Sequence, residues 1–423
     1  MLKICQSWSD NFRATFSPDK SVIVIQRAPG DHQVYGDFCL NGKELKIVKS
    51  AEHLGIPIEE SGDNSETLVM ERMAKARRAI HGYLSLFDIK SFIPAAVKLE
   101  VWKTQFKFVL IYGLDTTNLK AGQLKRIEQF QSKVLRSIFK LSKRASSVKL
   151  RLLTGTTSMA YEIWKNRFGA LNNVLIKDTM VREVCLLAYY SEVKNSWTYQ
   201  TMRKLCDLLN REGLSDKLSP TTLIRQERNT YKENMKNILM GVELRRLEAD
   251  LSDGDIYRLP PEPMKNNLPL TNTPFTYSLQ RDMRYYAAIY TGDYYKNYRG
   301  PCKICVKSGR LKEDDQEKDD TRHLLSGRCV TDEAPAVKLA LANVLTLLRE
   351  LRPDSEISSN ECSEEVMTRF LLNPACPSLQ ENSLTPEELQ LSGLDIYIRR
   401  LFKEKHKRRY ALLRSLGIVV KRK

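Results

Sequence analysis

Three cysteines and one histidine have the spacing of ligands to a single metal ion. Two residues separate Cys302 from Cys305, seventeen separate Cys305 from His323, and five separate His323 from Cys329. A Cys-x2-Cys pair lets two thiolates of one tight turn reach the same ion, and thiolates combined with an imidazole suit tetrahedral zinc. Four protein ligands close the coordination sphere, so we expect a structural zinc whose binding energy contributes to folding.

The alternative is that these side chains are the free thiols and the histidine of a reduced protein. The acidic interval 311–320 is long for the middle of a compact zinc module and indicates a solvated loop. However, the chain has only nine cysteines and five histidines in 423 residues, so four of them rarely fall in this register by chance. We therefore predict a zinc module and keep free thiols as the alternative.

The charge of the chain indicates its class of partner. A formal net charge of +17 favours polyanions, and we expect RNA, DNA or both. Eleven lysines or arginines and one glutamate lie in residues 399–423, so much of the excess is at the C-terminal end. No apolar run approaches the roughly 18 residues of a membrane span, and we expect no signal peptide. We expect no membrane partner, no small-molecule substrate, and a location in the nucleus or the cytoplasm.

Short strands begin the series of elements that would position these groups. The β-branched residues of 21–25 predict a strand. Asn41 and Gly42 lie between two apolar segments and both accept the positive φ of a type I′ turn, which predicts a hairpin. A further strand is expected at about 53–58. Residues 1–60 should therefore form a small antiparallel sheet.

Several residues of this region carry a family resemblance. They are Trp8, Phe16, the segment 17–25, the segment 40–45 and the segment 50–55. In this order they resemble the part of a reverse transcriptase that follows its catalytic loop, in the non-LTR (LINE-type) retrotransposons. The resemblance implies that Lys20 approaches the incoming nucleotide and that His53, Leu54 and Gly55 form the turn of the primer grip. The alternative for Lys20 is a turn lysine in water.

The chain departs from that family at the catalytic carboxylates. Such a polymerase needs three carboxylates that hold two metal ions, and in the family two of them come from an aromatic-Ala-Asp-Asp turn expected before residue 1. The adjacent aspartates at 314–315 and 319–320 lie instead in the acidic loop. We assign no catalytic residue, expect this chain alone to be inactive, and expect Mg²⁺ only if the missing catalytic half is supplied.

Residues 62–145 have the periodicity of three helices, and Gly113 ends the second. Four cations fall at i, i+3, i+7 and i+10 of the third and predict one continuous basic ridge: Lys133, Arg136, Lys140 and Lys143. By position, and with the segment 110–113, this part resembles the polymerase thumb, which implies that the ridge contacts phosphates. A merely solvated basic face is the alternative.

The resemblance continues towards the C-terminus. Members of the family carry a Cys-Cys-His-Cys module after the thumb, with a His-Leu-Leu step that 323–325 matches. The tyrosines and cations of 281–299 predict either a platform that stacks unpaired bases or a helix packed on the zinc module. The basic C-terminal helix could bind nucleic acid, act as a nuclear import signal, or pack on the thumb with its charges in water.

We therefore predict an α+β, mainly helical protein with a small antiparallel sheet, a thumb-like bundle and a small zinc module. The predicted units are 1–60 (residual palm and primer-grip hairpin), 61–145 (thumb-like helices), 146–253 (helical extension), 254–276 (proline-rich linker), 277–330 (tyrosine-rich basic segment and zinc module), 331–392 (acidic and loosely ordered) and 393–423 (basic C-terminal helix). The predicted function is that of a nucleic-acid-binding C-terminal fragment of a LINE-type reverse transcriptase. The alternatives are a domesticated zinc-dependent host protein, or a degenerate reading frame without a selected function.

Overall fold

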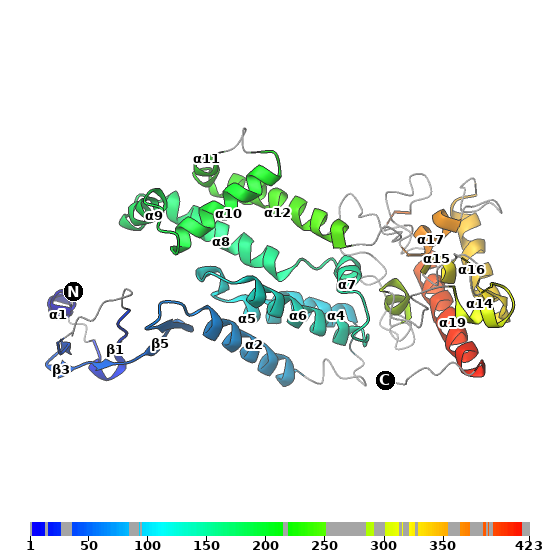
Figure 1. Ribbon diagram of the computed structural model, residues 1–423, viewed down its shortest axis with the longest axis horizontal. Coiled ribbons are helices and arrows are strands. Elements are labelled where there is room, and N and C mark those ends of the chain that lie inside the picture. The colour runs from blue at the N-terminus through cyan, green and yellow to red at the C-terminus, as the bar shows by residue number, and fades with distance from the viewer. Residues whose placement is uncertain are drawn as a thin grey trace.

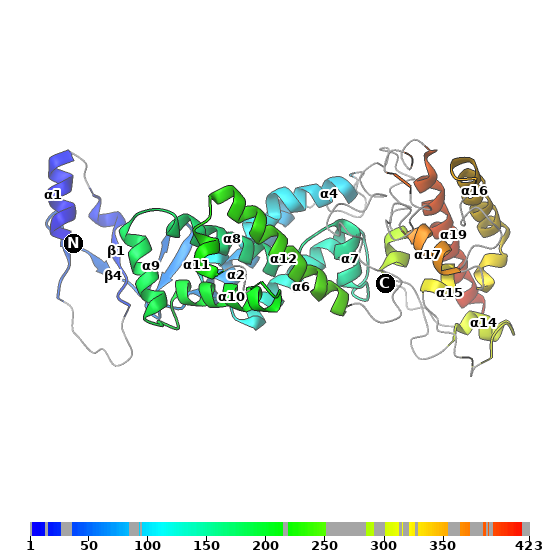
Figure 2. The ribbon, with the colours of Figure 1, turned by 90° about the horizontal axis from the view of Figure 1, so that it is seen from above.

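The computed structural model is mainly helical, with small sheets of two strands each (Figure 1). It describes residues 2–12, 16–26, 36–83, 93, 95–214, 219–250, 285–291, 301–312, 315, 321–325, 329–353, 364–372, 384–385, 388 and 392–416. Seen from above, the N-terminal strands, the helical middle and the C-terminal helices follow one another along the long axis (Figure 2). The predicted mainly helical α+β class is confirmed at this coarse level.

The first predicted hairpin is confirmed, but the sheet around it differs from the expectation. β2 (Cys39–Leu40) pairs with β3 (Lys43–Glu44) through Asn41 and Gly42, whose φ angles are 50° and 74°. β1 (Val22–Ile23) lies parallel to β4 (Lys46–Ile47), not antiparallel. A parallel pair needs a long connection, and here the connection contains the β2–β3 hairpin.

A second hairpin replaces the single strand predicted at 53–58. β5 (Ser50–His53) pairs antiparallel with β6 (Ile56–Glu59). Leu54 and Gly55 form the turn between them with φ angles of 50° and 79°. The strand predicted from the residues alone was wrong because leucine rarely takes a positive φ, whereas the turn that the family resemblance implied at His53, Leu54 and Gly55 is present.

The three helices predicted for 62–145 are present. They are α2 (Ser65–Gly82), the stretch formed by α4 (Ala95–Val101), a π-helical turn (Trp102–Phe106) and α5 (Lys107–Ile111), and α6 (Ala121–Ile138). Gly113 has φ 75°, as expected of a glycine that follows a helix C-terminus. Leu68, Trp102 and Ile127 are fully buried and place the core between the three helices.

A helical extension covers one side of this bundle (Figure 1). It consists of α7 (Ser147–Thr154), α8 (Met159–Leu175), α9 (Met180–Tyr190), α10 (Trp197–Arg211), α11 (Pro220–Ile224) and α12 (Arg228–Asp250). A serine or threonine side chain caps the N-terminus of α7 to α11 by accepting a backbone N–H, which explains why these helices begin where they do. Phe168, Leu205 and Tyr231 lie in a second apolar core.

The C-terminal part is more ordered than predicted. Its elements are a helical turn at 285–290, α14 (Lys303–Lys307), α15 (Thr321–Leu325), a 3-10 turn (Val330–Glu333), α16 (Pro335–Leu351), α17 (Glu364–Leu372) and α19 (Leu394–Ser415). The expectation of a loosely ordered 331–392 is wrong for α16 and α17, because Val344 and Phe370 are fully buried in the main core. The proline-rich linker at 254–276 lies outside the described residues.

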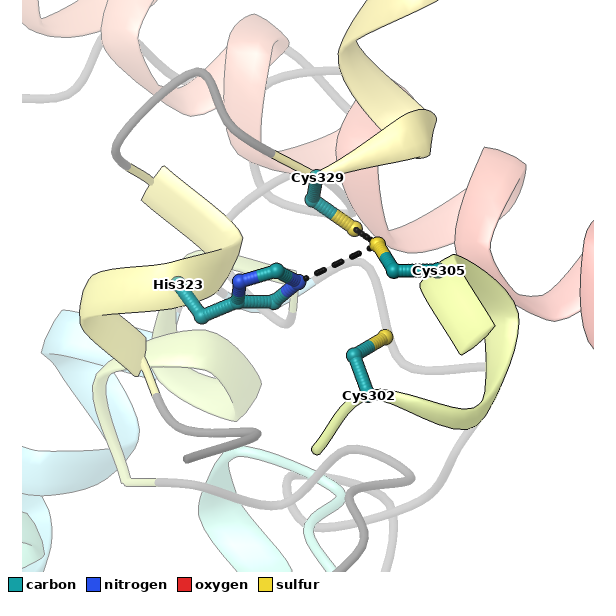
Figure 3. Close-up of side chains that lie close together, drawn as sticks. All are labelled: Cys302, Cys305, His323 and Cys329. Atoms are coloured by element: carbon teal, nitrogen blue, oxygen red, sulfur yellow. Dashed lines mark hydrogen bonds between the residues drawn. The ribbon is translucent and has the colours of Figure 1, made fainter. Parts of the chain in front are cut away.

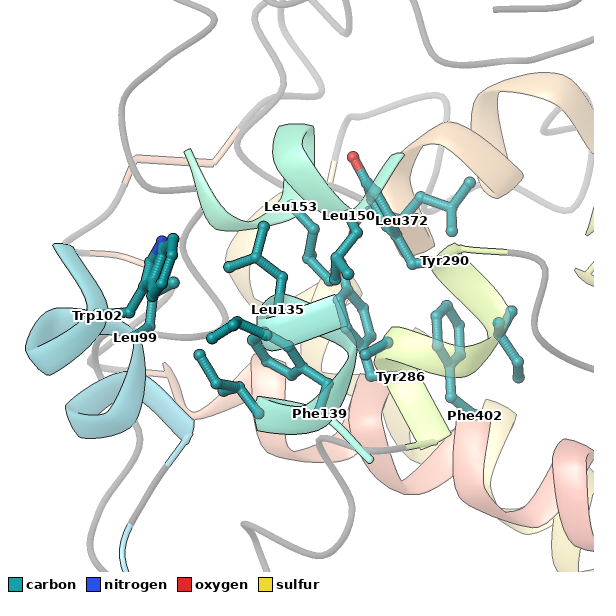
Figure 4. Packing of buried hydrophobic residues seen from close by; sticks show 14 of the residues in the cluster. Leu99, Trp102, Leu135, Phe139, Leu150, Leu153, Tyr286, Tyr290, Leu372 and Phe402 are labelled. Atoms are coloured by element: carbon teal, nitrogen blue, oxygen red, sulfur yellow. The ribbon is translucent and has the colours of Figure 1, made fainter. Parts of the chain in front are cut away.

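Tyr286 and Tyr290 join the C-terminal helices to the bundle (Figure 4). Tyr286 is 1% exposed, stacks on Phe402 of α19 with ring centroids 5.0 Å apart, and donates its hydroxyl to the carbonyl oxygen of Leu372. Leu150 of α7 belongs to the same buried cluster. These two tyrosines therefore pack in a core and do not form a platform for unpaired bases. Residues 281–284 and 292–299 of that tyrosine-rich segment lie outside the described residues.

The left-handed conformation of Gly113 leads to a first prediction. A Cβ at this position would lie 3.0 Å from Cγ1 of Ile56, so Gly113→Ala combines backbone strain with a steric conflict. We expect the free energy of unfolding to fall by about 1–3 kcal/mol in urea denaturation followed by circular dichroism. Gly122→Ala is the matched control, because nothing lies within 4 Å of its Cβ position in α6. Equal stability of the two variants would contradict the predicted strain and steric conflict at position 113.

Candidate metal centre

The four predicted metal ligands converge on one buried point (Figure 3). Cys302 directly precedes α14, Cys305 lies within α14, His323 lies in α15, and Cys329 precedes the 3-10 turn. Their ligand atoms all lie within 4.8 Å of one another, and all four side chains are buried. The acidic interval between the second and third ligands therefore does not prevent the two halves of the site from meeting.

The distances within the cluster fit a tetrahedral zinc ion. Sγ of Cys305 lies 3.8 Å from Sγ of Cys329 and 3.3 Å from Nε2 of His323. Zinc–sulfur bonds of about 2.3 Å at tetrahedral angles place two sulfur atoms about 3.8 Å apart, and a sulfur and a nitrogen slightly closer. The site can hold a structural Zn²⁺, and these four residues would be its ligands.

Two of the thiols shift each other's pKa in opposite directions. Hydrogen bonds from Cys305 and Cys329 lower the pKa of the Cys302 thiol, and the Arg409 guanidinium adds to this lowering. Hydrogen bonds to Cys302 and Cys329, together with burial, raise the pKa of the Cys305 thiol. A divalent cation that displaces the thiol protons would bind all three sulfur atoms as thiolates.

The sequence analysis missed the contacts that Arg409, Lys405 and Asp332 make next to this cluster. Arg409 and Lys405 of α19 are fully buried, and Arg409 donates from Nη1 to Sγ of Cys302 at 3.4 Å. Lys405 donates to the carbonyl oxygen of Leu324 at 2.9 Å and forms an ion pair with Asp332. The sequence contained an indication of this burial, because both cations fall at i+4 steps between the apolar residues 401 and 413 and so share one face of the helix.

This burial contradicts one of the three alternatives given for the C-terminal helix, in which the helix packs with its charges in water. Of the cations counted in the basic C-terminal segment, Arg399, Lys405 and Arg409 have no exposed surface. Those exposed to solvent on α19 are Arg400, Lys407, Arg408 and Arg414. Residues after Leu416 lie outside the described part of the chain. The number of cations that α19 can offer to a polyanion is therefore smaller than the sequence implies.

The eight residues predicted to contact nucleic acid lie on three separate elements. Lys20 is exposed at the end of a 3-10 turn (Pro18–Lys20), and His53, Leu54 and Gly55 lie at the tip of the β5–β6 hairpin. That tip is tied to the bundle, because the Tyr112 hydroxyl donates to the carbonyl oxygen of Leu54 at 3.0 Å. The buried Arg72 donates to the carbonyl oxygen of Gly55.

The continuous basic ridge predicted on α6 is not present. α6 ends at Ile138, and Lys140 takes φ 54°, so Lys140 and Lys143 lie beyond the helix. Arg136 points back and donates to the carbonyl oxygen of Ala145 at 3.0 and 2.9 Å. A helix that ends in a left-handed residue reverses direction there, which breaks the spacing. Lys133 remains exposed on the helix.

A cationic groove lies between α2 and α6 instead. It has a volume of about 530 Å³, and its lining combines cations with apolar side chains: Met73, Arg77, Ile80, His81, Arg126, Gln129, Phe130, Lys133, Val134 and Ser137. The guanidinium of Arg77 lies 5.9 Å from the centre of the Phe130 ring, and Arg126 is paired with Glu66. The sequence analysis missed this groove because its cations are divided between two helices.

Comparisons with known proteins found no matching family model, no matching curated protein and no matching solved structure. Among the described helices, none combines the length and the apolar character that a membrane crossing needs.

The geometry predicts one bound zinc per chain. Cys305→Ser should lower the zinc content of the purified protein, measured by elemental analysis, to well below one ion, because three ligands bind far more weakly than four. Cys39→Ser is the control, since Cys39 is an exposed cysteine of the N-terminal hairpin. Wild-type protein without zinc, or a Cys305→Ser variant with a full complement, would contradict the site.

Proposed function

We propose that this chain is a nucleic-acid-binding, zinc-containing C-terminal part of a LINE-type reverse transcriptase. The observation that supports it most is the groove between α2 and α6, which belongs to the helices that resemble a polymerase thumb. The resemblance of residues 16–55 and 302–329 to that family extends the proposal beyond binding alone. The assignment to a LINE-type reverse transcriptase rests on this resemblance.

The groove has the chemistry of a site for a polynucleotide. Arg77 on α2 and Lys133 on α6 are exposed on its two walls, and Phe130 and Val134 form an apolar floor. Cations hold phosphates without regard to sequence, while apolar and aromatic surfaces accept sugars and base faces. A groove of this composition suits a polyanion that also has flat apolar parts, which describes RNA or DNA.

The hairpin tip adds a second support for the same proposal. Leu54 is 76% exposed, although the carbonyl groups of the turn are fixed to Arg72 and Tyr112 of the bundle. Arg72 also lies 4.7 Å from the centre of the Tyr112 ring. A rigid, exposed turn held next to a helical bundle is what a primer grip requires, and this role for His53, Leu54 and Gly55 is part of the proposal.

Reversing two charges across the groove tests the binding. We expect the double variant Arg77→Glu, Lys133→Glu to bind RNA or DNA at least about tenfold more weakly at 0.1 M salt, because each lost phosphate contact removes counterion release. The slope of log affinity against log salt should fall by about 2. Filter binding or fluorescence anisotropy over a salt series measures both quantities.

A matched control separates the groove from general charge. Lys232 and Lys236 are exposed on α12, and reversing both changes the net charge equally. If the α12 variant loses as much affinity as the groove variant, or if neither loses any, the groove is not the binding site.

The proposal assigns binding to this chain and no synthesis. Among the described residues, the Cys-Cys-His-Cys cluster is the only group of three or more side chains suited to a metal ion. We expect a primer-extension assay with Mg²⁺ and a primed RNA template to give no longer product than the same reaction with a chelator. Extension that requires Mg²⁺ and co-purifies with the chain would show that this part of the proposal is wrong.

A further inference from the structure

α19 reaches the metal cluster from a distant part of the sequence. Arg409 follows Cys302 by 107 residues and Cys329 by 80, yet its Nη1 lies 3.4 Å from Sγ of Cys302 and 3.8 Å from Sγ of Cys329. The Arg409 side chain has no exposed surface. A guanidinium is always charged in proteins, so a full positive charge lies beside the two sulfur atoms in a site closed to water.

The net charge of the site with a bound metal ion is opposite to the charge of Arg409. A divalent ion bound by three thiolates and one neutral imidazole carries one net negative charge. A buried charge is costly unless a partner neutralises it, and Arg409 supplies one positive charge at hydrogen-bonding distance. The metal–thiolate group and the guanidinium together are therefore neutral, which allows both to be buried.

Other contacts fix α19 to the same module. Lys405, one turn before Arg409, donates to the carbonyl oxygen of Leu324, the residue after the ligand His323. It also pairs with Asp332 in the 3-10 turn that follows Cys329. One turn after Arg409, Leu413 is fully buried in a small apolar cluster with Cys302, Cys305 and Cys329. One face of α19 thus touches the segments that carry the metal ligands.

We infer that metal binding and the docking of α19 are a single coupled event, with Arg409 as the positioning residue that couples them. Without the metal, the sulfur atoms that Arg409 contacts are no longer held at one point by a common ion, and the docked position of α19 loses support. Loss of the metal also affects the packing between α19 and the helical bundle, because Phe402 on α19 stacks on Tyr286 in the core shared with the bundle. The metal therefore also sets the position of the exposed cations Arg400 and Arg408.

The wild-type protein provides the first test. Hydrogen exchange is measured on the full chain with zinc and after removal of zinc by a chelator. We expect exchange to become faster throughout α19 on zinc removal and to stay unchanged in α12, which belongs to the second apolar core. Unchanged protection of α19 in the metal-free protein would overturn the inference, and this measurement needs no variant that could fail to fold.

Substitution of Arg409 provides the second test. Co²⁺ is used as the probe, and its affinity is measured by competition with a chelator while the thiolate-to-cobalt absorption is recorded. Arg409→Met keeps an unbranched apolar stem and removes the charge, so we expect about 10- to 100-fold weaker binding and a shifted charge-transfer band. Arg409→Lys should restore part of the affinity, and Arg408→Met, on the exposed neighbour, should bind as the wild type does.

The possible results distinguish the role of Arg409 from the existence of the metal centre and from the proposed nucleic-acid-binding groove. Wild-type affinity and an unchanged spectrum in Arg409→Met would overturn the role of Arg409, even if the chain binds cobalt. Absence of cobalt binding to the wild type would remove the metal centre and this inference together. Neither result touches the proposed groove, which is tested by RNA or DNA binding to variants of α2 and α6.

Discussion

The burial of cations on α19 is the constraint that organises the C-terminal half of the structure. A chain with a net charge of +17 buries Arg399, Lys405 and Arg409 on one helix, and the free energy of burial is favourable only if each charge has polar partners. Asp332 and the carbonyl oxygen of Leu324 serve Lys405, and cysteine sulfur atoms serve Arg409. The metal module and the last long helix are consequently one folding unit, although their sequences lie far apart.

That unit is joined to the helical bundle through apolar packing. Tyr286 stacks on Phe402, and the backbone N–H of Ser146 donates to the carbonyl oxygen of Thr291 at 3.1 Å. One continuous buried cluster therefore runs from the bundle to α16 and α19. The sequence analysis assigned the thumb-like helices (61–145) and the zinc module (277–330) to separate units, but one buried core contains residues of both.

Local signals predicted the elements well, and long-range contacts explain the errors. The turn at Asn41 and Gly42, the helix end at Gly113 and the Cys-x2-Cys pair each depend only on residues close in sequence. Periodicity and spacing were therefore sufficient to predict them. The turn at Leu54 depends on contacts with Tyr112, and the inward direction of Arg136 depends on the carbonyl oxygen of Ala145. Neither partner can be identified from a single sequence, because both are chosen by tertiary packing. The metal ligands were predicted from their local spacing, whereas the contact between Arg409 and Cys302 spans 107 residues and was not predicted.

The π-helical turn at Trp102–Phe106 has a consequence for how the bundle can change over evolution. Such a turn holds one residue more than the α-helical turn it replaces, and one residue corresponds to a rotation of about 100° around the helix axis. Trp102 and Phe106, the first and last residues of this turn, and Leu110 in the α-helical stretch after it are all buried in the same core. Because the π turn absorbs an extra residue, a single-residue deletion within it is expected to leave an α-helical turn and to keep Leu110 in the core, whereas the same deletion elsewhere in the helix would rotate the following residues out of register.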